Sequence, residues 1–118
     1  MIKAEWREAI KRACSEAGTY RPFFDTIIEE LAQILEIRDT AMAQYVASGN
    51  SPVVTHTNKG GHSNIVKNPA LAVINEQNQQ ALAYWRDLGL TPAGYKKLNG
   101  DIEQRDTTFE DALAKIGV

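Results

Sequence analysis

The stretch Leu88-Gly89-Leu90-Thr91-Pro92 decides the fold, because it ends one helix and begins the next within a few residues. Glycine is favoured just past a helix C-terminus, since it adopts the left-handed backbone conformation at little cost. Threonine followed by proline is typical of a helix start, with threonine as the N-cap and proline in the first turn. The stretch therefore predicts a helix, a break and a second helix over 92–98, with Leu90 packed into the core between them.

The helix before this break begins at Asn68-Pro69, which combines an asparagine N-cap with proline at the first helical position. Apolar residues then recur at helical spacing up to Leu88, so one face of this helix is predicted to pack. Asn78 lies on or near that face and would need a partner if it were buried. The positions expected along the face are Leu71, Ile74, Asn78, Leu82, Trp85 and Leu88.

Residues 53–66 predict a β-hairpin. A β-rich arm, Val53–Thr57, precedes the turn cluster Asn58-Lys59-Gly60-Gly61, and residues 62–66 can form the returning arm. An isolated two-stranded hairpin is marginal in water, so it should dock on another surface or project from the fold. His56 and His62 flank the turn and could face each other, but two ligands without a third do not indicate a metal site.

Residues 22–48 predict a long helix whose apolar stripe is wider than a two-stranded coiled coil needs. We therefore expect this helix to touch two neighbours. Arg38 interrupts the stripe, so an acidic partner or an exposed end is expected there. The heptad-like seam contains Phe24, Ile27, Leu31, Ile34, Ala41 and Tyr45, and Ile28, Leu35 and Met42 widen it on one side.

Residues 3–17 predict an amphipathic helix that carries Lys3, Arg7 and Lys11 along one face. Two interpretations of these cations remain open. Basic side chains in a row can contact phosphates, and they can also form a solvated flank beside nearby glutamates, which is the commoner arrangement. Cys14 lies on the same helix, and without a positioned base it is expected to be a packing residue rather than a nucleophile.

Length, charge and composition exclude several classes of protein. The chain has 118 residues, enough for one domain, with a net charge of −2 and a single cysteine. Charge is nevertheless segmented, with residues 1–21 and 51–98 net positive and 22–50 and 99–118 net negative. The start of the chain lacks an apolar signal region, and no apolar run is long enough to span a membrane. No constellation of residues indicates catalysis, a metal or a cofactor, so we predict a protein that is not an enzyme.

Three signals in this order resemble the small subunit of tailed-bacteriophage terminases: the Lys59-Gly60-Gly61 hairpin after a long helix, the Asn68-Pro69 helix start, and the run from Leu88 to Pro92. The resemblance covers roughly residues 21–98. It implies an oligomeric ring that binds viral double-stranded DNA near the packaging start and regulates a large ATPase and nuclease subunit. It also implies a location in the cytoplasm of the infected or lysogenic bacterial host.

Together these observations predict a mainly α fold with a long central helix, shorter packed helices and one projecting β-hairpin. Residues 1–98 would form a helical oligomerisation and DNA-recognition domain, and residues 99–118 an acidic tail with a short helix. The alternative is a helical protein–protein adaptor without DNA binding. The DNA-binding candidates are Lys3, Arg7, Lys11, Arg12, Lys96 and Lys97, and the oligomer-interface candidates are Phe24, Ile27, Leu31, Ile34, Arg38, Tyr45, Lys59 and His62.

Overall fold

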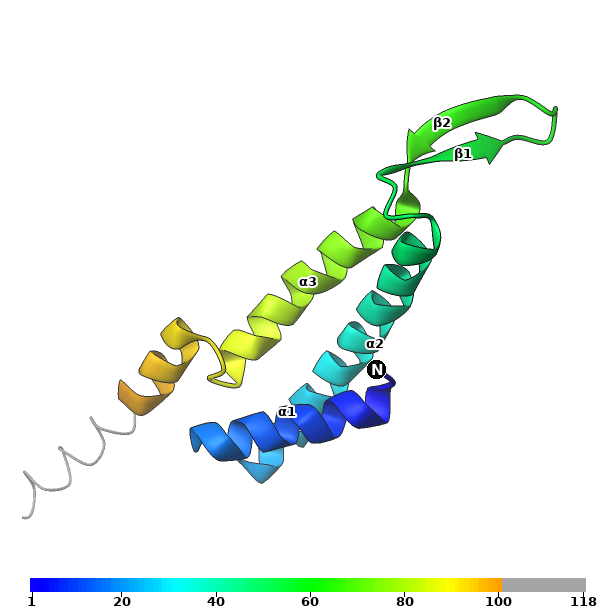
Figure 1. Cartoon of the computed structure of the whole chain (residues 1–118). Helices are drawn as coiled ribbons and strands as arrows, with labels where there is room; N and C mark the ends of the chain where they lie inside the picture. Colours follow the sequence, from blue (N-terminus) through cyan, green and yellow to red (C-terminus); the bar gives the residue numbers. More distant parts are fainter. Residues whose placement is uncertain (101–118) are drawn as a thin grey trace, which may run out of the picture.

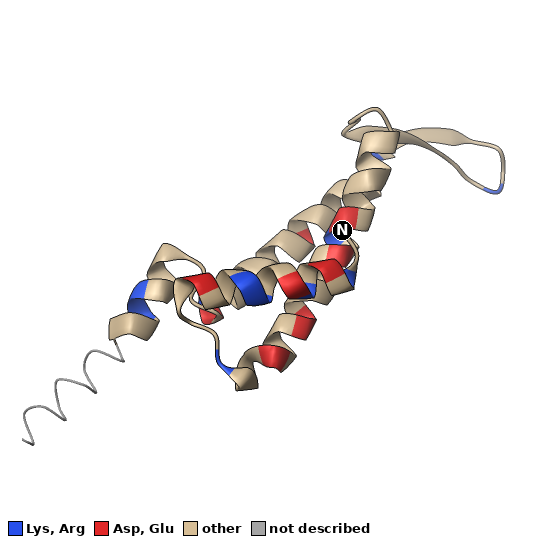
Figure 2. Cartoon of the chain, turned by 60° about the horizontal axis from the view of Figure 1, so that its bottom comes forward, with Lys and Arg blue, Asp and Glu red and all other residues tan. Residues whose placement is uncertain are grey.

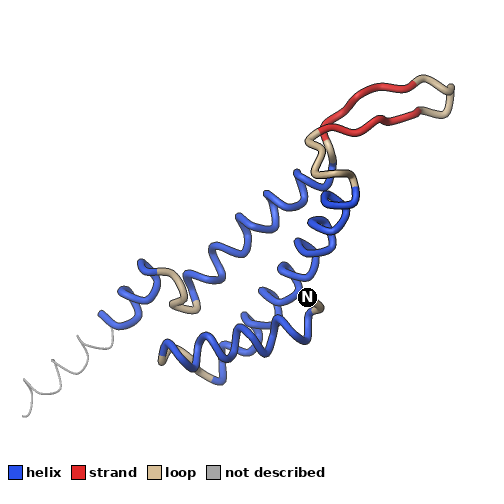
Figure 3. The backbone as a smooth tube through the Cα atoms, viewed as in Figure 1, coloured by secondary structure: helices blue, strands red, loops and turns tan. Residues whose placement is uncertain are grey.

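The computed structural model describes residues 1–100, and the fold is mainly α, as predicted (Figures 1 and 3). One helix follows the last labelled element and occupies residues 92–100. The elements before it are α1 (Lys3–Ala17), the 3-10 turn η1 (Pro22–Phe24), α2 (Asp25–Ala47), β1 (Val53–Thr57), β2 (Ser63–Lys67) and α3 (Pro69–Asp87).

Helices α2 and α3 lie side by side and antiparallel, and α1 crosses the first half of α2 (Figure 1). The wide stripe on α2 is explained by this arrangement, because one side of it meets α1 and the other meets α3. The core contains Ile28, Leu31 and Leu35 from α2, with Ile10 from α1 and Leu88 after α3, all nearly inaccessible to solvent. The prediction that the long helix touches two neighbours is confirmed.

The second half of α2 has only one of those neighbours. Ile28, Leu35 and Met42 are spaced by heptads on one side of the helix, yet Met42 is 41% exposed where Leu35 is fully buried. Val46, one turn further, is 58% exposed. Helix α1 covers the first part of this side, and its N-terminus lies near Asp39, so the apolar side chains beyond that point remain at the surface.

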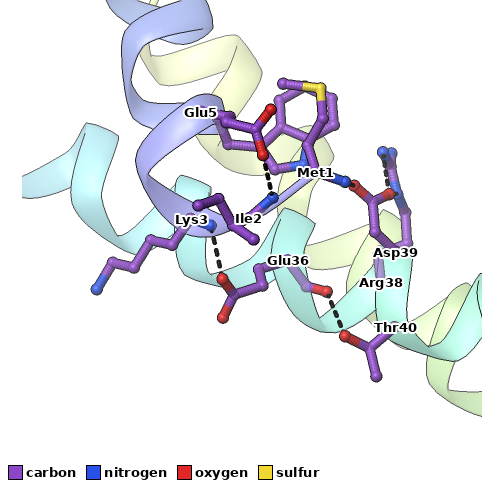
Figure 4. A network of polar contacts seen from close by, with 9 residues as sticks. Met1, Ile2, Lys3, Glu5, Glu36, Arg38, Asp39 and Thr40 are labelled. Carbon is purple, nitrogen blue, oxygen red and sulfur yellow. Dashed lines mark hydrogen bonds and ion pairs between the residues drawn. The ribbon is translucent and has the colours of Figure 1, made fainter.

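A polar network joins the start of α1 to α2 (Figure 4). The amino group of Met1 and the indole Nε1 of Trp6 both donate to Oδ2 of Asp39, at 2.9 and 2.7 Å. The guanidinium of Arg38 lies 5.4 Å from the centre of the Trp6 ring and donates to Oδ1 of Asp39. The acidic partner expected for Arg38 is therefore its neighbour Asp39, and Asn78 of α3 accepts a further bond at 3.4 Å.

The two strands form an antiparallel hairpin that projects from the far end of the α2–α3 pair (Figures 1 and 3). Its base is tied to the helices by Asn68, whose Oδ1 caps α3 by accepting from the Ala70 amide. The Nδ2 of the same side chain donates to Ser48 Oγ and the Ser51 carbonyl. The predicted hairpin and the predicted asparagine cap are both confirmed.

The break at Leu88 to Pro92 requires glycine for two reasons. Gly89 has a φ of +72°, and a Cβ there would stand 2.6 Å from Leu98 Cδ1. Helix 92–100 packs back against the end of α3, where Gly94 lies against the backbone carbonyl of Arg86. Leu90 is half-buried against the core, as expected. Small residues thus let the short helix approach closely.

Several local predictions are corrected. The last described helix continues through residues 99 and 100, so the predicted break after Leu98 is wrong there; the remainder of the predicted tail lies outside the described residues. Leu82 is 50% exposed, because the neighbouring Ala81 takes the core position of α3. The histidines do not face each other, since the register pairs His56 with Asn64. None of the described helices is long and apolar enough to cross a membrane.

Candidate nucleic-acid interface

The predicted basic strip of α1 faces acidic residues of α2 rather than open solvent. Arg7 forms a two-pronged contact with Glu29, at 2.5 Å from Nε to Oε2 and 3.0 Å from the second nitrogen to Oε1. The ammonium groups of Lys3 and Lys11 lie 3.9 Å from carboxylate oxygens of Glu29 and Asp25. Each cation remains about one-third exposed, but its charge is largely balanced within the chain.

These contacts change proton affinities in the expected directions. The hydrogen bond from Arg7 lowers the pKa of Glu29, and the same contact raises the pKa of Arg7. Burial acts to raise the pKa of Asp39, but bonds from the amino terminus, Trp6 and Arg38 together leave that pKa below its usual value. The α1–α2 contact is therefore strongest when both carboxylates are ionised.

The remaining DNA-binding candidates lie elsewhere. Arg12 points away from the core on α1, and Lys96 and Lys97 are exposed on helix 92–100. None of the three forms an ion pair with another of the residues 1–100. Helix 92–100 and the end of α1 share one end of the molecule (Figures 1 and 2), and side chains from both regions, Leu98 and Thr19, lie against Gly89.

Sequence reasoning did not single out Arg21, which is exposed in the loop at this same end. Arg86 is also exposed there, in the last turn of α3.

The interface candidates fall into three groups. Phe24, Leu31 and Ile34 are buried in the chain's own core, and Leu31 has no exposed surface at all. Ile27, Arg38 and Tyr45 are half-buried, whereas Lys59 and His62 are exposed at the hairpin tip. The exposed apolar side chains of α2 are instead Ile37, Met42 and Val46, and the exposure of Met42 and Val46 could be foreseen only if the reach of α1 were known.

A shallow groove of about 250 Å³ runs along the second half of α2 against the start of α3. Its lining combines Ile37, Thr40, Ala41, Gln44 and Val73 with a single charged residue, Glu36. No nucleophile and base converge on it. Among the residues that the structure describes, no three His, Cys, Asp or Glu side chains lie close enough to hold a metal ion.

Cys14 is completely buried, and burial raises the pKa of its thiol. A raised pKa leaves the thiol protonated and weakly nucleophilic. Its environment is that of a packing residue, in agreement with the sequence analysis.

Comparison with protein families identifies the family to which the chain belongs. A family model described as phage terminase, small subunit, matches residues 3–105, which is most of the chain. The chain belongs to the phage terminase small subunit family. The searches of curated proteins and of solved structures returned no match.

The family match begins at the start of α1, well before the motifs that first indicated the resemblance. In this terminase small subunit, α1, the helix pair, the hairpin and helix 92–100 are therefore all parts of the family domain. Membership supports a role in packaging the phage genome.

Proposed function

We propose that this terminase small subunit binds viral double-stranded DNA near the packaging start, as a ring-like oligomer that regulates the large ATPase and nuclease subunit. This takes place in the cytoplasm of the infected or lysogenic bacterial host. The chain's own part is recognition and assembly, while the large subunit supplies the catalysis.

One observation carries the DNA-binding proposal: Arg12, Lys96 and Lys97 are exposed at one end of the molecule without an ion-pair partner among residues 1–100. A cation beside a carboxylate presents a weaker net positive potential to a phosphate than a cation with no acid nearby, because the two opposite charges partly cancel. Unpaired cations gain the full effect of counterion release. Phosphate contact is therefore assigned to this end, and the α1 strip serves to hold α1 on α2.

The test is a salt titration of binding to a labelled duplex, followed by fluorescence anisotropy. Replacing Lys96 and Lys97 together by alanine should weaken binding and reduce the slope of log affinity against log salt by about 2. The matched control replaces Lys3 and Lys11 by alanine, which removes the same charge from the paired strip and should leave the slope nearly unchanged.

Two other results of this titration would change the proposal. If the Lys3 and Lys11 control lowers the slope while the Lys96 and Lys97 variant does not, the phosphate contact belongs to α1. If the wild-type protein shows no salt-sensitive binding to any duplex, the DNA-binding proposal is wrong. The helical adaptor, whose acidic segment 22–50 would meet a protein partner, then becomes the better hypothesis.

The oligomer proposal rests on the uncovered side of α2. Met42 and Val46 are exposed aliphatic side chains on the part of α2 that α1 leaves uncovered, and exposed apolar surface of this kind is typical of protein interfaces. Changing both to glutamate should lower the mass measured by light scattering, because two charges would be buried in the interface. Leu82→Glu, at a similarly exposed aliphatic position on α3, is the matched control and should leave the mass unchanged.

A strictly monomeric wild-type protein at micromolar concentration would contradict this part of the proposal. An unchanged mass in the Met42 and Val46 variant, beside an oligomeric wild type, would move the interface to the half-buried candidates Ile27 and Tyr45 or to the hairpin.

A further inference from the structure

We propose that the tip of the β-hairpin, residues 55–64, is a second DNA contact that reads base edges in the major groove. This inference rests on the proposed DNA-binding function and adds to it a sequence-reading element. From the sequence, Lys59 and His62 in this tip are expected at an oligomer interface. Contact with a neighbouring subunit is therefore the alternative that the experiment below distinguishes from DNA contact.

The hairpin is built to reach away from the protein. Nearly all of its strand residues are exposed on both faces, and it contacts the helices only at its base, through Asn68 (Figure 1). A two-stranded ribbon of this kind fits the major groove of B-form DNA, whose width also admits an α-helix. The shape of the element is therefore suitable without any rearrangement.

The charge of this region favours a polyanion. No aspartate or glutamate occurs between Asp39 and Glu76, so 36 consecutive residues, 40–75, are free of acidic side chains. Lys59 stands at the tip and Lys67 near the base, and Figure 2 shows the hairpin otherwise free of charge. Nothing acidic on the hairpin would repel a phosphate as the tip enters a groove.

The composition of the hairpin changes from aliphatic near the helices to polar at the tip. Its exposed aliphatic side chains, Val53, Ile65 and Val66, all lie in the half nearest the helices. Residues 55–64, in contrast, contain no aliphatic and no acidic side chain, and eight of the ten carry a hydroxyl, amide, imidazole or ammonium group. Protein interface cores are depleted in lysine and serine and enriched in apolar and aromatic side chains. The tip therefore has the composition of a nucleic-acid contact.

The tip is also pre-organised. The Oδ1 atom of Asn58 accepts from the amides of Gly60 and His62, each at 3.0 Å, and the Asn58 amide donates to the His62 carbonyl at 2.9 Å. The hydroxyls of Thr57 and Ser63 lie 2.9 Å apart across the strands. These bonds fix the turn that presents Lys59 and lower the entropy lost on binding.

The strand register identifies the base-reading side chains. His56 and Asn64 are directly opposite each other, so both project from the same face of the ribbon. An asparagine amide can form two bonds to the edge of adenine, and an imidazole can donate to or accept from a base edge. The structure thus assigns Asn64 and His56 to base edges and Lys59 to a phosphate.

The experiment uses the full chain and a randomised duplex library, with selection and sequencing of the bound fraction. The wild-type protein should enrich a common sequence. Changing His56 and Asn64 together to alanine should abolish that enrichment and lower affinity for the selected duplex about tenfold, while affinity for a mixed-sequence duplex stays nearly the same. Thr55→Ala, on the opposite face of the ribbon, is the matched control and should enrich the wild-type sequence.

A second measurement locates the contact. Methylation of guanine N7 in the selected duplex marks the major groove, and it should interfere with wild-type binding but less with binding of the His56 and Asn64 variant. Lys59→Ala should reduce the salt slope by about 1, whereas Lys67→Ala, with the same charge change at the base, should reduce it less.

The outcomes separate this inference from the proposed function. If the wild-type protein binds duplex DNA but the His56 and Asn64 variant enriches the same sequence at the same affinity, the hairpin inference is wrong and the DNA-binding function stands. If that variant instead lowers the oligomer mass, the tip is a subunit contact and the inference is overturned. If the wild type binds no DNA, both are wrong.

Discussion

The two halves of α2 have similar apolar spacing and opposite surroundings. In the first half, α1 covers Ile28 and Leu35, and the acidic residues Asp25, Glu29 and Glu36 meet α1 cations or amides. In the second half, Met42 and Val46 stay exposed, acidic residues cease after Asp39, and the chain leads into a projecting hairpin. One helix thus serves both the interior of the monomer and its outer surface.

This difference teaches which groups the monomer needs for its own stability and which it leaves for partners. Where three helices meet, the apolar core is buried and the facing charges of α1 and α2 are paired. Beyond that point, apolar side chains and unpaired cations are presented to solvent. Changes in the first half should therefore affect folding, and changes in the second half should affect association.

The largest expected effect is on the covered apolar face. Leu35→Ala should lower the free energy of unfolding by about 2–5 kcal/mol, because it leaves a cavity among α1, α2 and α3. The matched substitution Met42→Ala, one heptad along, should change it by less than about 0.5 kcal/mol in the monomer. Urea unfolding followed by circular dichroism measures both, and equal losses would mean that the two halves are not distinct.

A smaller effect is expected at the joint between the second half and the hairpin. Asn68→Ala should cost about 1–2 kcal/mol, since it removes the cap of α3 and the bonds to Ser48 and Ser51. Asn68→Asp is the informative control, because it keeps the capping oxygen but loses the amide donor. A hairpin whose amide exchange is no faster in the alanine variant would show that Asn68 does not hold the base.

The smallest expected effect is the acid sensitivity of the α1–α2 contact. Glu29 and Asp39 have pKa values below their ordinary 4.5 and 3.8 in the folded chain. A lowered folded pKa adds stability that is present above the unfolded pKa and is lost as the pH falls through the folded value. Thermal unfolding temperatures should therefore decline below about pH 4.

Asp39→Asn and Glu29→Gln should each flatten that decline, most clearly when combined. Glu30→Gln is the control, because it changes an exposed carboxylate that has no partner among the described ion pairs. Its unfolding temperature should depend on pH as that of the wild type does. An identical profile in the double variant would assign the acid sensitivity to other carboxylates.

Much of the secondary structure could be predicted because its determinants are local. The caps at Asn68-Pro69 and Thr91-Pro92, the turn at 58–61 and the helical spacing of apolar residues act within a few positions of the chain. The candidate site was less predictable. Lys3, Arg7 and Lys11 have the spacing of a phosphate-binding strip, and nothing near them in sequence reveals Glu29 and Asp25 as their partners.

The sequence by itself determined the helices, the hairpin, the break at Leu88 to Pro92 and the family resemblance, since these depend on backbone preferences and short-range order. Only the tertiary structure decided which cations are balanced and which apolar side chains stay exposed. Those outcomes depend on where the N-terminus of α1 lies against α2 and on how closely helix 92–100 approaches α3 at Gly89 and Gly94. Pairing and burial are relations between distant segments, and no local pattern contains them.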